Sequence, residues 1–519
     1  MNRRMNSCSS LLRSKLLQIG MILIFIFSIL IPVSPLYTTS LSRDSGVYEY
    51  VSWRIINGAV VYKDVWDHKP PVIFLLNVIS FKLFGLSQWS IWILEFVFIL
   101  LSVFILYITL ARLFSSNVAF LISILFIICI AQLGIYNSPE LYSLLFQLML
   151  VYLFLFGAAS RIKLNCLLMG FLTALCFYTK QTCAGIGVII GLWFIFEFIT
   201  RKASLKVFFS KIGFLCLGFF IPTIIILLYF LFNNSLETFW SAAFLYNFAQ
   251  IYSSIFAKIN AMIFGLDLLR QFTGLSIFAL AGWFLSLYLI HPAAGSLTDI
   301  DLKKYQKLIF LISIGVVVET VLSGISPFAF DHYYLTLLPV FCLSTALLIY
   351  MLYHLIQRTE VLLARYMLLV FLLLILSIQF SSRSLYWPFS YRNFSSGQAE
   401  IVNYIDNNSA PNDSVLLVGA ESSINFLAKR VSPTRFVYQY PLANELYTNQ
   451  KMLDVFFSDI QKNKPRLIID TKNSRILSGQ YYNPNLLYSL FKKDWFIRSC
   501  PKDPLATNTY KLDIYVCNW

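Results

Sequence analysis

The chain has 519 residues, of which 58% are hydrophobic and only 13% are charged, and its mean hydropathy is +0.71. A soluble globular protein carries roughly 25% charged residues, so long stretches of this chain cannot face water. The composition therefore excludes a large soluble protein and predicts a polytopic α-helical membrane protein. The net charge of +15 does not indicate nucleic-acid binding, because the cations fall mostly in short loops between apolar segments.

The first apolar segment, residues 16–36, follows a basic stretch that contains Arg13 and Lys15. Signal peptides and retained first helices both have this order. The apolar segment is long and no small-x-small cleavage site follows it, so we expect a retained helix rather than a cleaved signal.

Hydropathy over a window of roughly 19 residues predicts about eleven transmembrane helices. Each expected span is close to the roughly 20 residues that cross a bilayer. Together they form a domain over residues 16–390, after a cytoplasmic N-terminus of residues 1–15. The expected spans are 16–36, 89–110, 118–135, 140–158, 164–180, 183–199, 212–232, 273–290, 308–326, 333–353 and 366–381.

Basic residues predict the orientation of these helices in an inner or plasma membrane. Cytoplasmic loops are enriched in Lys and Arg, so the basic loops and the N-terminus are expected in the cytoplasm. An odd number of spans then places the C-terminal region outside. The basic residues occupy every second loop: Arg112; Arg161 and Lys163; Arg201, Lys202, Lys206 and Lys211; Lys303, Lys304 and Lys307; Arg358 and Arg365.

Two outer loops are long enough to contain structure of their own. In the loop 37–88, residues 47–56 have apolar residues at helical spacing, and residues 72–84 are apolar but too short to span a bilayer. We expect both segments to be helices that lie along the membrane surface, and the loop 233–270 is likewise amphipathic.

Residues 391–519 have the composition of a separate soluble region. Short apolar runs that alternate with helical patterns predict a small extracytoplasmic α/β domain. Its two cysteines, Cys500 and Cys517, are expected to pair, because an extracytoplasmic compartment permits disulfides. The expected helices are 398–407 and 446–460, and the apolar runs are 415–418, 436–438 and 467–469.

Polar and ionisable residues gather beside the predicted outer ends of the spans. The first loop contributes Asp44, Tyr62, Asp67, His68 and Lys69, and later loops contribute Glu140, Lys180, Arg270, His332 and Tyr333.

Structural roles would explain several of these residues without any chemistry. Asp44 could belong to a helix cap, and Glu140 follows Ser-Pro in a pattern typical of a helix start. Lys69 and Lys180 could extend to the membrane interface. Two further carboxylates, Glu95 and Glu319, are expected in the outer halves of spans, where ionisable groups tend to face cavities.

The first loop resembles that of the GT-C superfamily of membrane glycosyltransferases, over roughly residues 40–90. Within that superfamily it is similar to family 39, which includes protein O-mannosyltransferases and lipid A aminoarabinose transferases. A weaker likeness continues through Glu140, Lys180 and His332, and the C-terminal region resembles the variable domains of the superfamily. The first-loop residues that carry the resemblance are Asp44, Gly46, Tyr48, Gly58, Tyr62, Asp64, Lys69, Pro70, Pro71, Phe84 and Gly85.

The resemblance implies a polyprenyl-phosphate sugar donor and an acceptor at the outer membrane face. It implies that Asp44 is the catalytic base or a group that positions the acceptor, that Glu140 is a second acidic site residue, and that Lys69 lies near the carrier phosphate. Many relatives have Asp where this chain has Glu140, so the chain departs from the family pattern there.

The residue types suit an inverting transfer of this kind. A sugar phosphodiester leaves a phosphate that needs no proton but does need cations to stabilise its developing charge. Lys69, Lys180, His332 and Arg270 could supply them. The acceptor hydroxyl loses a proton as it attacks, so a carboxylate such as Asp44 must lie within hydrogen-bond reach.

Two other functions fit the number of spans: a transporter or flippase of lipid-linked glycans, and a ligase or polymerase that joins whole glycans. A transporter would place ionisable residues near the middle of the membrane and would show matched halves, and the sequence shows neither. No cofactor is certain. Asp67, His68 and His332 are residue types that bind divalent metals, but their spacing matches no strong metal motif.

Overall fold

The computed structural model describes residues 2–37, 40–134, 137–290, 302–358, 396–419, 421–472 and 481–519. The chain divides into two compact units. Unit 1 comprises Met1–Ser34, Trp92–Ile225 and Ser253–Ser390, and unit 2 comprises Pro35–Ile91, Ile226–Tyr252 and Tyr391–Trp519.

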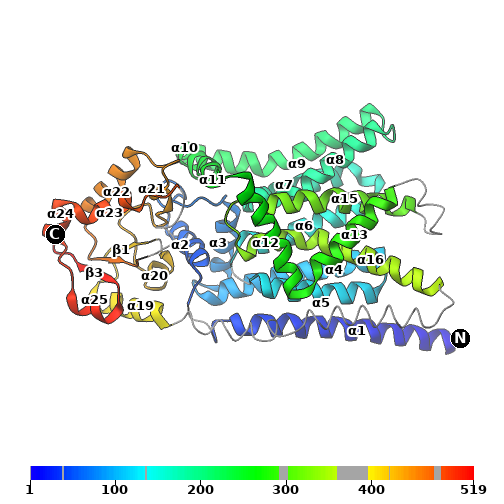
Figure 1. Cartoon of the computed structure of the whole chain (residues 1–519), viewed down its shortest axis with the longest axis horizontal. Helices are drawn as coiled ribbons and strands as arrows, with labels where there is room; N and C mark the ends of the chain where they lie inside the picture. The colour runs from blue at the N-terminus through cyan, green and yellow to red at the C-terminus, as the bar shows by residue number, and fades with distance from the viewer. Residues whose placement is uncertain are drawn as a thin grey trace. The chain divides into compact units, whose positions relative to one another are not determined.

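Long apolar helices make up most of unit 1 (Figure 1). Among the described residues, nine helices are long and apolar enough to cross a membrane, or ten if one interrupted pair counts as a single span. These nine coincide with nine of the predicted spans. The nine are formed by α1 (Asn2–Leu30), α4 (Gln88–Leu113), α5 (Ser116–Leu133), α6 (Pro139–Phe156), α7 (Ile162–Thr179), α8 (Gly185–Ile199), α9 (Leu205–Phe232), α15 (Leu302–Ser323) and α16 (Leu338–Arg358). α12 (Ile255–Thr273) belongs to the interrupted pair, and α13 (Leu275–Ile290) is a shorter apolar helix.

The two remaining predicted spans have different outcomes. The span expected at 273–290 is α13, an apolar helix that is shorter than the others. The span expected at 366–381 lies outside the described residues.

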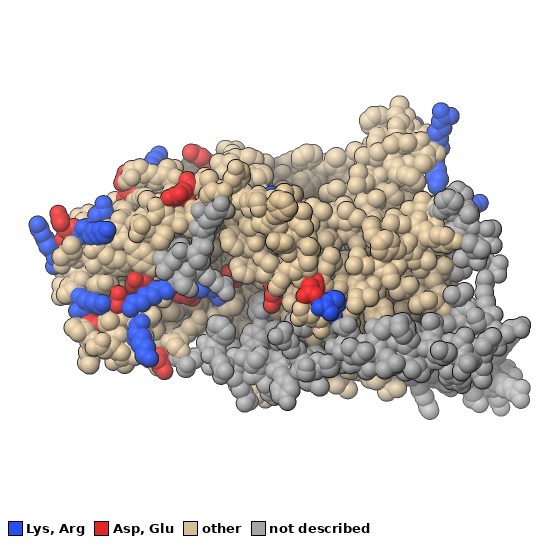
Figure 2. All heavy atoms as spheres, viewed as in Figure 1, with Lys and Arg blue, Asp and Glu red and all other residues tan. Residues whose placement is uncertain are grey.

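The span helices differ in how far other helices cover them. In the most apolar window, 72% of residues are buried for Pro139–Phe156 and for Asp331–His354, but only 22% for Leu205–Phe232. The first two are therefore central, whereas α9 exposes apolar side chains that suit lipid rather than water. On the face shown in Figure 2, charged side chains are sparse over the described span helices and gather over the C-terminal elements.

The first outer loop forms the two predicted helices, α2 (Arg43–Ile56) and α3 (Val72–Phe84). α2 begins four residues before the predicted start because the Oγ of Ser42 accepts a hydrogen bond from the N–H of Ser45 at 3.2 Å. Gly46 lets α2 pack against α20 (Ser422–Leu427), since a Cβ at that position would collide with Ser423. That both helices lie along the membrane surface stays a prediction.

The second outer loop contributes three short consecutive helical pieces to unit 2. They are α10 (Leu236–Trp240), a π-helical turn η4 (Ser241–Leu245) and α11 (Tyr246–Gln250).

The C-terminal region contains a three-stranded sheet in the order β1-β2-β3. β1 (Val415–Val418) pairs in parallel with β2 (Leu467–Asp470), which pairs antiparallel with β3 (Asp513–Val516). Every residue of β1 and β2 is buried, as expected for strands covered on both faces. The surrounding helices are α19 (Ser396–Asn408), α21 (Tyr440–Ala443), α22 (Gln450–Asn463), α23 (Pro484–Tyr488), α24 (Asp494–Ser499) and α25 (Pro504–Tyr510).

The sheet confirms the predicted fold class, a polytopic helical membrane protein with a C-terminal α/β region. The apolar run at 436–438 forms no strand; its residues are buried in a bent segment. The third strand, β3, was not predicted, because Asp513–Val516 is short and only one of its residues is fully buried.

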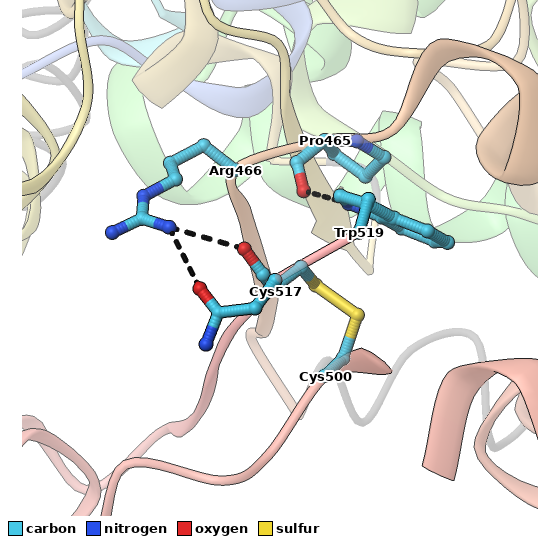
Figure 3. Close-up of a disulfide and its surroundings, with 6 residues drawn as sticks. Pro465, Arg466, Cys500, Cys517 and Trp519 are labelled. Atoms are coloured by element: carbon cyan, nitrogen blue, oxygen red, sulfur yellow. Dashed lines mark hydrogen bonds between the residues drawn. A yellow bond between two sulfur atoms is a disulfide. The ribbon is translucent and has the colours of Figure 1, made fainter. Parts of the chain in front are cut away.

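The predicted disulfide between Cys500 and Cys517 is present, and Figure 3 shows the contacts around it. Nη1 of Arg466 donates to the carbonyl oxygen of Cys517 at 3.1 Å, and the indole N–H of Trp519 donates to the carbonyl oxygen of Pro465 at 2.8 Å. The last residues of the chain are therefore fixed to β2 and to the segment that precedes it.

Candidate active site

The predicted site residues fall into two groups, one in each unit. Unit 2 contains Asp44, Tyr62, Asp67, His68 and Lys69, and unit 1 contains Glu140, Lys180, Arg270, His332 and Tyr333.

Asp44 lies in the first turn of α2 and is half-buried. It does not cap the helix, because Ser42 does so. Ser45 donates instead to Oε1 of Glu49 at 2.7 Å. The capping role that could have explained Asp44 therefore belongs to another residue, although the helix N-terminus still favours a carboxylate at this position.

The residue before Asp44 ties α2 to the C-terminal region of unit 2. Nε and Nη2 of Arg43 donate to Oε1 of Glu421 at 3.1 and 2.9 Å, and Nη1 donates to the hydroxyl of Tyr440 at 3.0 Å. A guanidinium that uses three of its donors in this way has a fixed orientation. The network therefore fixes the N-terminal turn that carries Asp44.

The loop between α2 and α3 is held by its own hydrogen bonds. Tyr62 has a left-handed backbone with φ 69°, and its N–H donates to the carbonyl oxygen of Val65 at 2.7 Å. Its buried hydroxyl donates to the carbonyl oxygen of Lys69 at 2.6 Å. The N–H of Trp66 donates to the carbonyl oxygen of Arg435 at 2.8 Å. Tyr62 thus closes the loop that contains the next three site residues.

Asp67 is the most perturbed carboxylate of this group. It is 1% exposed, and its Oδ1 accepts a hydrogen bond from the N–H of Lys69 at 2.7 Å. Nδ1 of His68 lies 3.9 Å from the same oxygen. Burial raises the pKa of Asp67 to about 7, the N–H and the charge of Lys69 oppose this change, and the charge of Asp44 adds to it. Asp44 and Asp67 therefore share one electrostatic environment.

Aromatic rings from three segments of unit 2 surround this loop. The indole of Trp66 stacks on Tyr438 with ring centroids 6.0 Å apart, and the ring of His68 lies 5.3 Å from both Tyr438 and Tyr246. Burial raises the pKa of Tyr438, and the neighbouring Tyr440 and Asp44 raise it further. The site is thus a pair of carboxylates in a poorly solvated aromatic environment.

In unit 1, Glu140 and Lys180 form a buried ion pair. Glu140 is 1% exposed in the first turn of α6, where Ser138 is the cap and Pro139 the first residue. Nζ of Lys180 donates to Oε1 of Glu140 and lies 3.4 Å from the ring centroid of Tyr333. Lys180 is therefore engaged with a carboxylate and an aromatic face, not extended to an interface.

A third carboxylate lies near this pair. Glu319 on α15 is completely buried, and a Cβ at Gly185 would collide with its Oε1, so the glycine at the start of α8 makes room for the carboxylate. Glu319 was predicted as an ionisable residue within a span, and its burial against α8 agrees with that prediction.

The other predicted cations have different environments. The side chain of Arg270 is half-exposed and pairs with Asp267, one turn earlier in α12. The ring of His332 stacks on Phe330 and meets Tyr333 edge-on at 4.9 Å. Within the described ranges, no group of three or more His, Cys, Asp or Glu side chains could hold a metal ion.

Sequence reasoning did not find the contributions of the C-terminal region to the site. Glu421, Tyr438 and Tyr440 contact first-loop residues more than 370 positions away in the sequence. The only local signal is the aromatic spacing of Phe436, Tyr438 and Tyr440, which resembles an ordinary buried strand.

Comparisons with known proteins agree with this fold. A family model described as dolichyl-phosphate-mannose-protein mannosyltransferase matches residues 68–226. The structure of ArnT from Cupriavidus metallidurans bound to undecaprenyl phosphate is 12% identical with a TM-score of 0.61, and that of its apo state is 11% identical with a TM-score of 0.58. Each comparison covers 96% of this chain and 97% of ArnT. No curated protein matches the chain by sequence.

At this identity the two ArnT structures establish the fold alone, and the chain shares that fold over almost its whole length. The matched segment and this fold both agree with the predicted resemblance to family 39 of the GT-C superfamily.

The raised pKa of Asp67 predicts a specific pH dependence of stability. An acid whose pKa is higher in the folded state stabilises the fold below its unfolded pKa, and this contribution is lost as the pH rises through about 7. We expect Asp67→Asn to gain stability relative to the wild type between pH 5 and pH 8, by about 1–4 kcal/mol. Thermal unfolding of the purified proteins across this range measures the difference.

Asp64→Asn provides the control, because Asp64 is an exposed residue of the same loop. A constant stability difference between Asp67→Asn and the wild type from pH 5 to pH 8 would contradict the raised pKa.

The buried pair in unit 1 predicts a non-additive double-mutant cycle. Lys180→Met leaves the carboxylate of Glu140 buried without its cation, so we expect a loss of about 3–5 kcal/mol. The double variant Glu140→Gln/Lys180→Met should lose clearly less, because no uncompensated charge remains. Unfolding midpoints of the four proteins give the coupling, with Lys206→Met at an exposed position as the control. Additive losses would show that the two side chains are not paired.

Proposed function

We propose that the chain is a GT-C glycosyltransferase that transfers a sugar, with inversion, from a polyprenyl-phosphate-linked donor to a hydroxyl of an extracytoplasmic acceptor. The fold and the matched family segment support the reaction class. ArnT with bound undecaprenyl phosphate supports a polyprenyl carrier by analogy. The observation that carries the proposal is the buried carboxylate of Asp67 beside Asp44, in a loop held by its own hydrogen bonds.

The proposed reaction is a single displacement. The acceptor oxygen forms a bond to the anomeric carbon while the bond from that carbon to the phosphate oxygen breaks. The electron pair stays on the phosphate, and the proton of the acceptor hydroxyl passes to a carboxylate. The chain must therefore supply one proton acceptor and several positive groups.

Asp44 is the proposed base. Asp44 is half-buried and can be reached by an acceptor, whereas Asp67 is 1% exposed. The network from Arg43 to Glu421 and Tyr440 holds Asp44 in place.

The proposed groups for the donor phosphate are cations in poorly solvated surroundings. Lys69 is 7% exposed, and Lys180 lies between Glu140 and the ring of Tyr333. His332 lies beside the same ring, and Arg270 is the more exposed candidate. In this proposal Glu140 keeps Lys180 charged and oriented until the phosphate binds.

Replacement of the proposed base should abolish most of the transfer. We expect Asp44→Asn to lower the turnover by about 100- to 10,000-fold, the usual contribution of a general base. Mass spectrometry of cell-envelope glycans, from cells with the wild-type copy, the variant copy or no copy, measures the product.

The matched control is Asp494→Asn, which changes an exposed carboxylate of the C-terminal region away from the candidate site residues. Undiminished product in a folded Asp44→Asn protein would remove Asp44 as the base and would leave Asp67 as the candidate.

The proposed orientation has the first outer loop and the C-terminal region outside the cytoplasm. The disulfide between Cys500 and Cys517 supports it, because cytoplasmic thiols are normally kept reduced. The basic loops at the other ends of the spans support the same orientation, since Lys and Arg are retained in the cytoplasm.

Cysteine labelling in intact cells tests this orientation. We expect a membrane-impermeant maleimide to label Lys63→Cys in the first loop but not Lys202→Cys in the loop after α8, because both side chains are exposed and only the first faces outward. Permeabilised cells, in which both positions react, provide the control. Labelling of Lys202→Cys alone in intact cells would reverse the orientation and contradict the proposed function.

A further inference from the structure

A polar cavity of about 950 Å³ lies within unit 2. This volume is near the upper end of the range for small-ligand sites. Its walls come from the first loop (Tyr50, Arg54 and residues 62–66), from Glu237, Thr238 and Ser241, and from three stretches of the C-terminal region: residues 412–414, residues 431–435 and several residues between 447 and 464. Three segments that are far apart in the sequence therefore build one cavity.

The charges that line the cavity nearly balance. Five cations oppose four carboxylates, which leaves a difference of only one charge and does not favour a strongly anionic ligand such as a phosphate. The remaining polar lining consists of hydroxyls and amides, which both donate and accept hydrogen bonds. The cations are Arg54, Lys63, Arg435, Lys451 and Lys464, and the carboxylates are Asp64, Glu237, Asp413 and Asp459.

Two buried polar atoms of the lining have no hydrogen-bond partner among the described residues. They are Oγ of Ser432, a residue that is 8% exposed, and Nε of Arg435. Burial lowers the pKa of the Arg435 guanidinium, and the charge of Asp459 only partly opposes this effect. Buried donors without partners are unfavourable unless a ligand or water satisfies them.

Aromatic side chains provide the other part of the lining. Of the aromatic residues in the lining, Tyr447 is half-buried, whereas Tyr62 and Trp66 are buried. A saccharide has an apolar C–H face that packs on an aromatic ring such as that of Tyr447, and hydroxyls that bond to planar polar groups. The combination of this ring, balanced charge and unsatisfied donors therefore matches a carbohydrate better than a lipid chain or a phosphate.

We propose that this cavity binds a saccharide portion of the acceptor. Trp66 lines the cavity and directly precedes Asp67, while Tyr62 lines it and donates to the backbone of Lys69. A saccharide bound here lies next to the loop that carries the two carboxylates. That the bound saccharide belongs to the acceptor rests on the proposed glycosyl transfer. That the cavity binds a saccharide does not depend on it.

Saturation-transfer NMR on the full-length protein in lipid nanodiscs tests binding without any transfer. The probes are the methyl glycosides of glucose, galactose, mannose and N-acetylglucosamine. We expect at least one of them to bind, and Arg435→Gln to weaken that binding about tenfold or more, because a hydrogen bond from a charged donor is lost.

Ser432→Ala removes only a hydroxyl and keeps the test independent of any effect of Arg435→Gln on folding. It should weaken the same glycoside severalfold. The matched control is Leu446→Ala in an adjacent hollow of about 490 Å³, whose lining includes Leu245 and Phe248; this variant should bind the glycoside as the wild type does.

Binding and catalysis can fail separately in this experiment. Asp44→Asn should keep glycoside binding although it loses sugar transfer. If the wild type binds a glycoside but transfers no sugar, the proposed function is refuted and the saccharide site stands. Absence of binding by all four glycosides, or equal binding by the wild type, Arg435→Gln and Ser432→Ala, would overturn the saccharide site.

Discussion

The geometry of unit 2 depends on the bonds that Arg43 makes with Glu421 and Tyr440. They join the first turn of α2 to a segment 378 residues later in the chain. The two surfaces can meet this closely because Gly46 has no side chain where α2 passes Ser423. The C-terminal region is therefore a structural part of the candidate active site rather than an independent appendage.

In unit 1 the corresponding interaction is an ion pair buried among apolar helices. An ionisable group among apolar helices needs a partner, and Glu140 and Lys180 provide one for each other. Their positions follow from helix ends: Glu140 is in the first turn of α6, and Lys180 lies where α7 ends and the chain becomes extended. This ion pair thus lies where the helices are interrupted.

The sequence predicts best whatever depends on local patterns. Hydropathy identified nine spans, and the bounds of α3 match the expected 72–84. The candidate residues Asp67, His68 and Lys69 are contiguous in the sequence, and the structure holds them in one hydrogen-bonded loop. The capping of α2 by Ser42, the strand β3 and the aromatic contacts of Tyr438 were not found. The strand and the aromatic contacts depend on tertiary packing. The cap of α2 could have come from several neighbouring polar residues, such as Asp44, and the sequence does not distinguish them.

The disulfide has a further consequence for the edge of the sheet. β3 pairs with β2 on one side, and on its other side Tyr515 forms an isolated antiparallel bridge with Lys502. The crosslink between Cys500 and Cys517 joins the end of β3 to the start of the segment that carries this bridge, and it keeps the two close together even when their backbone bonds open. Reductants would therefore loosen this outer segment first, while the parallel pair β1 and β2 keeps its register.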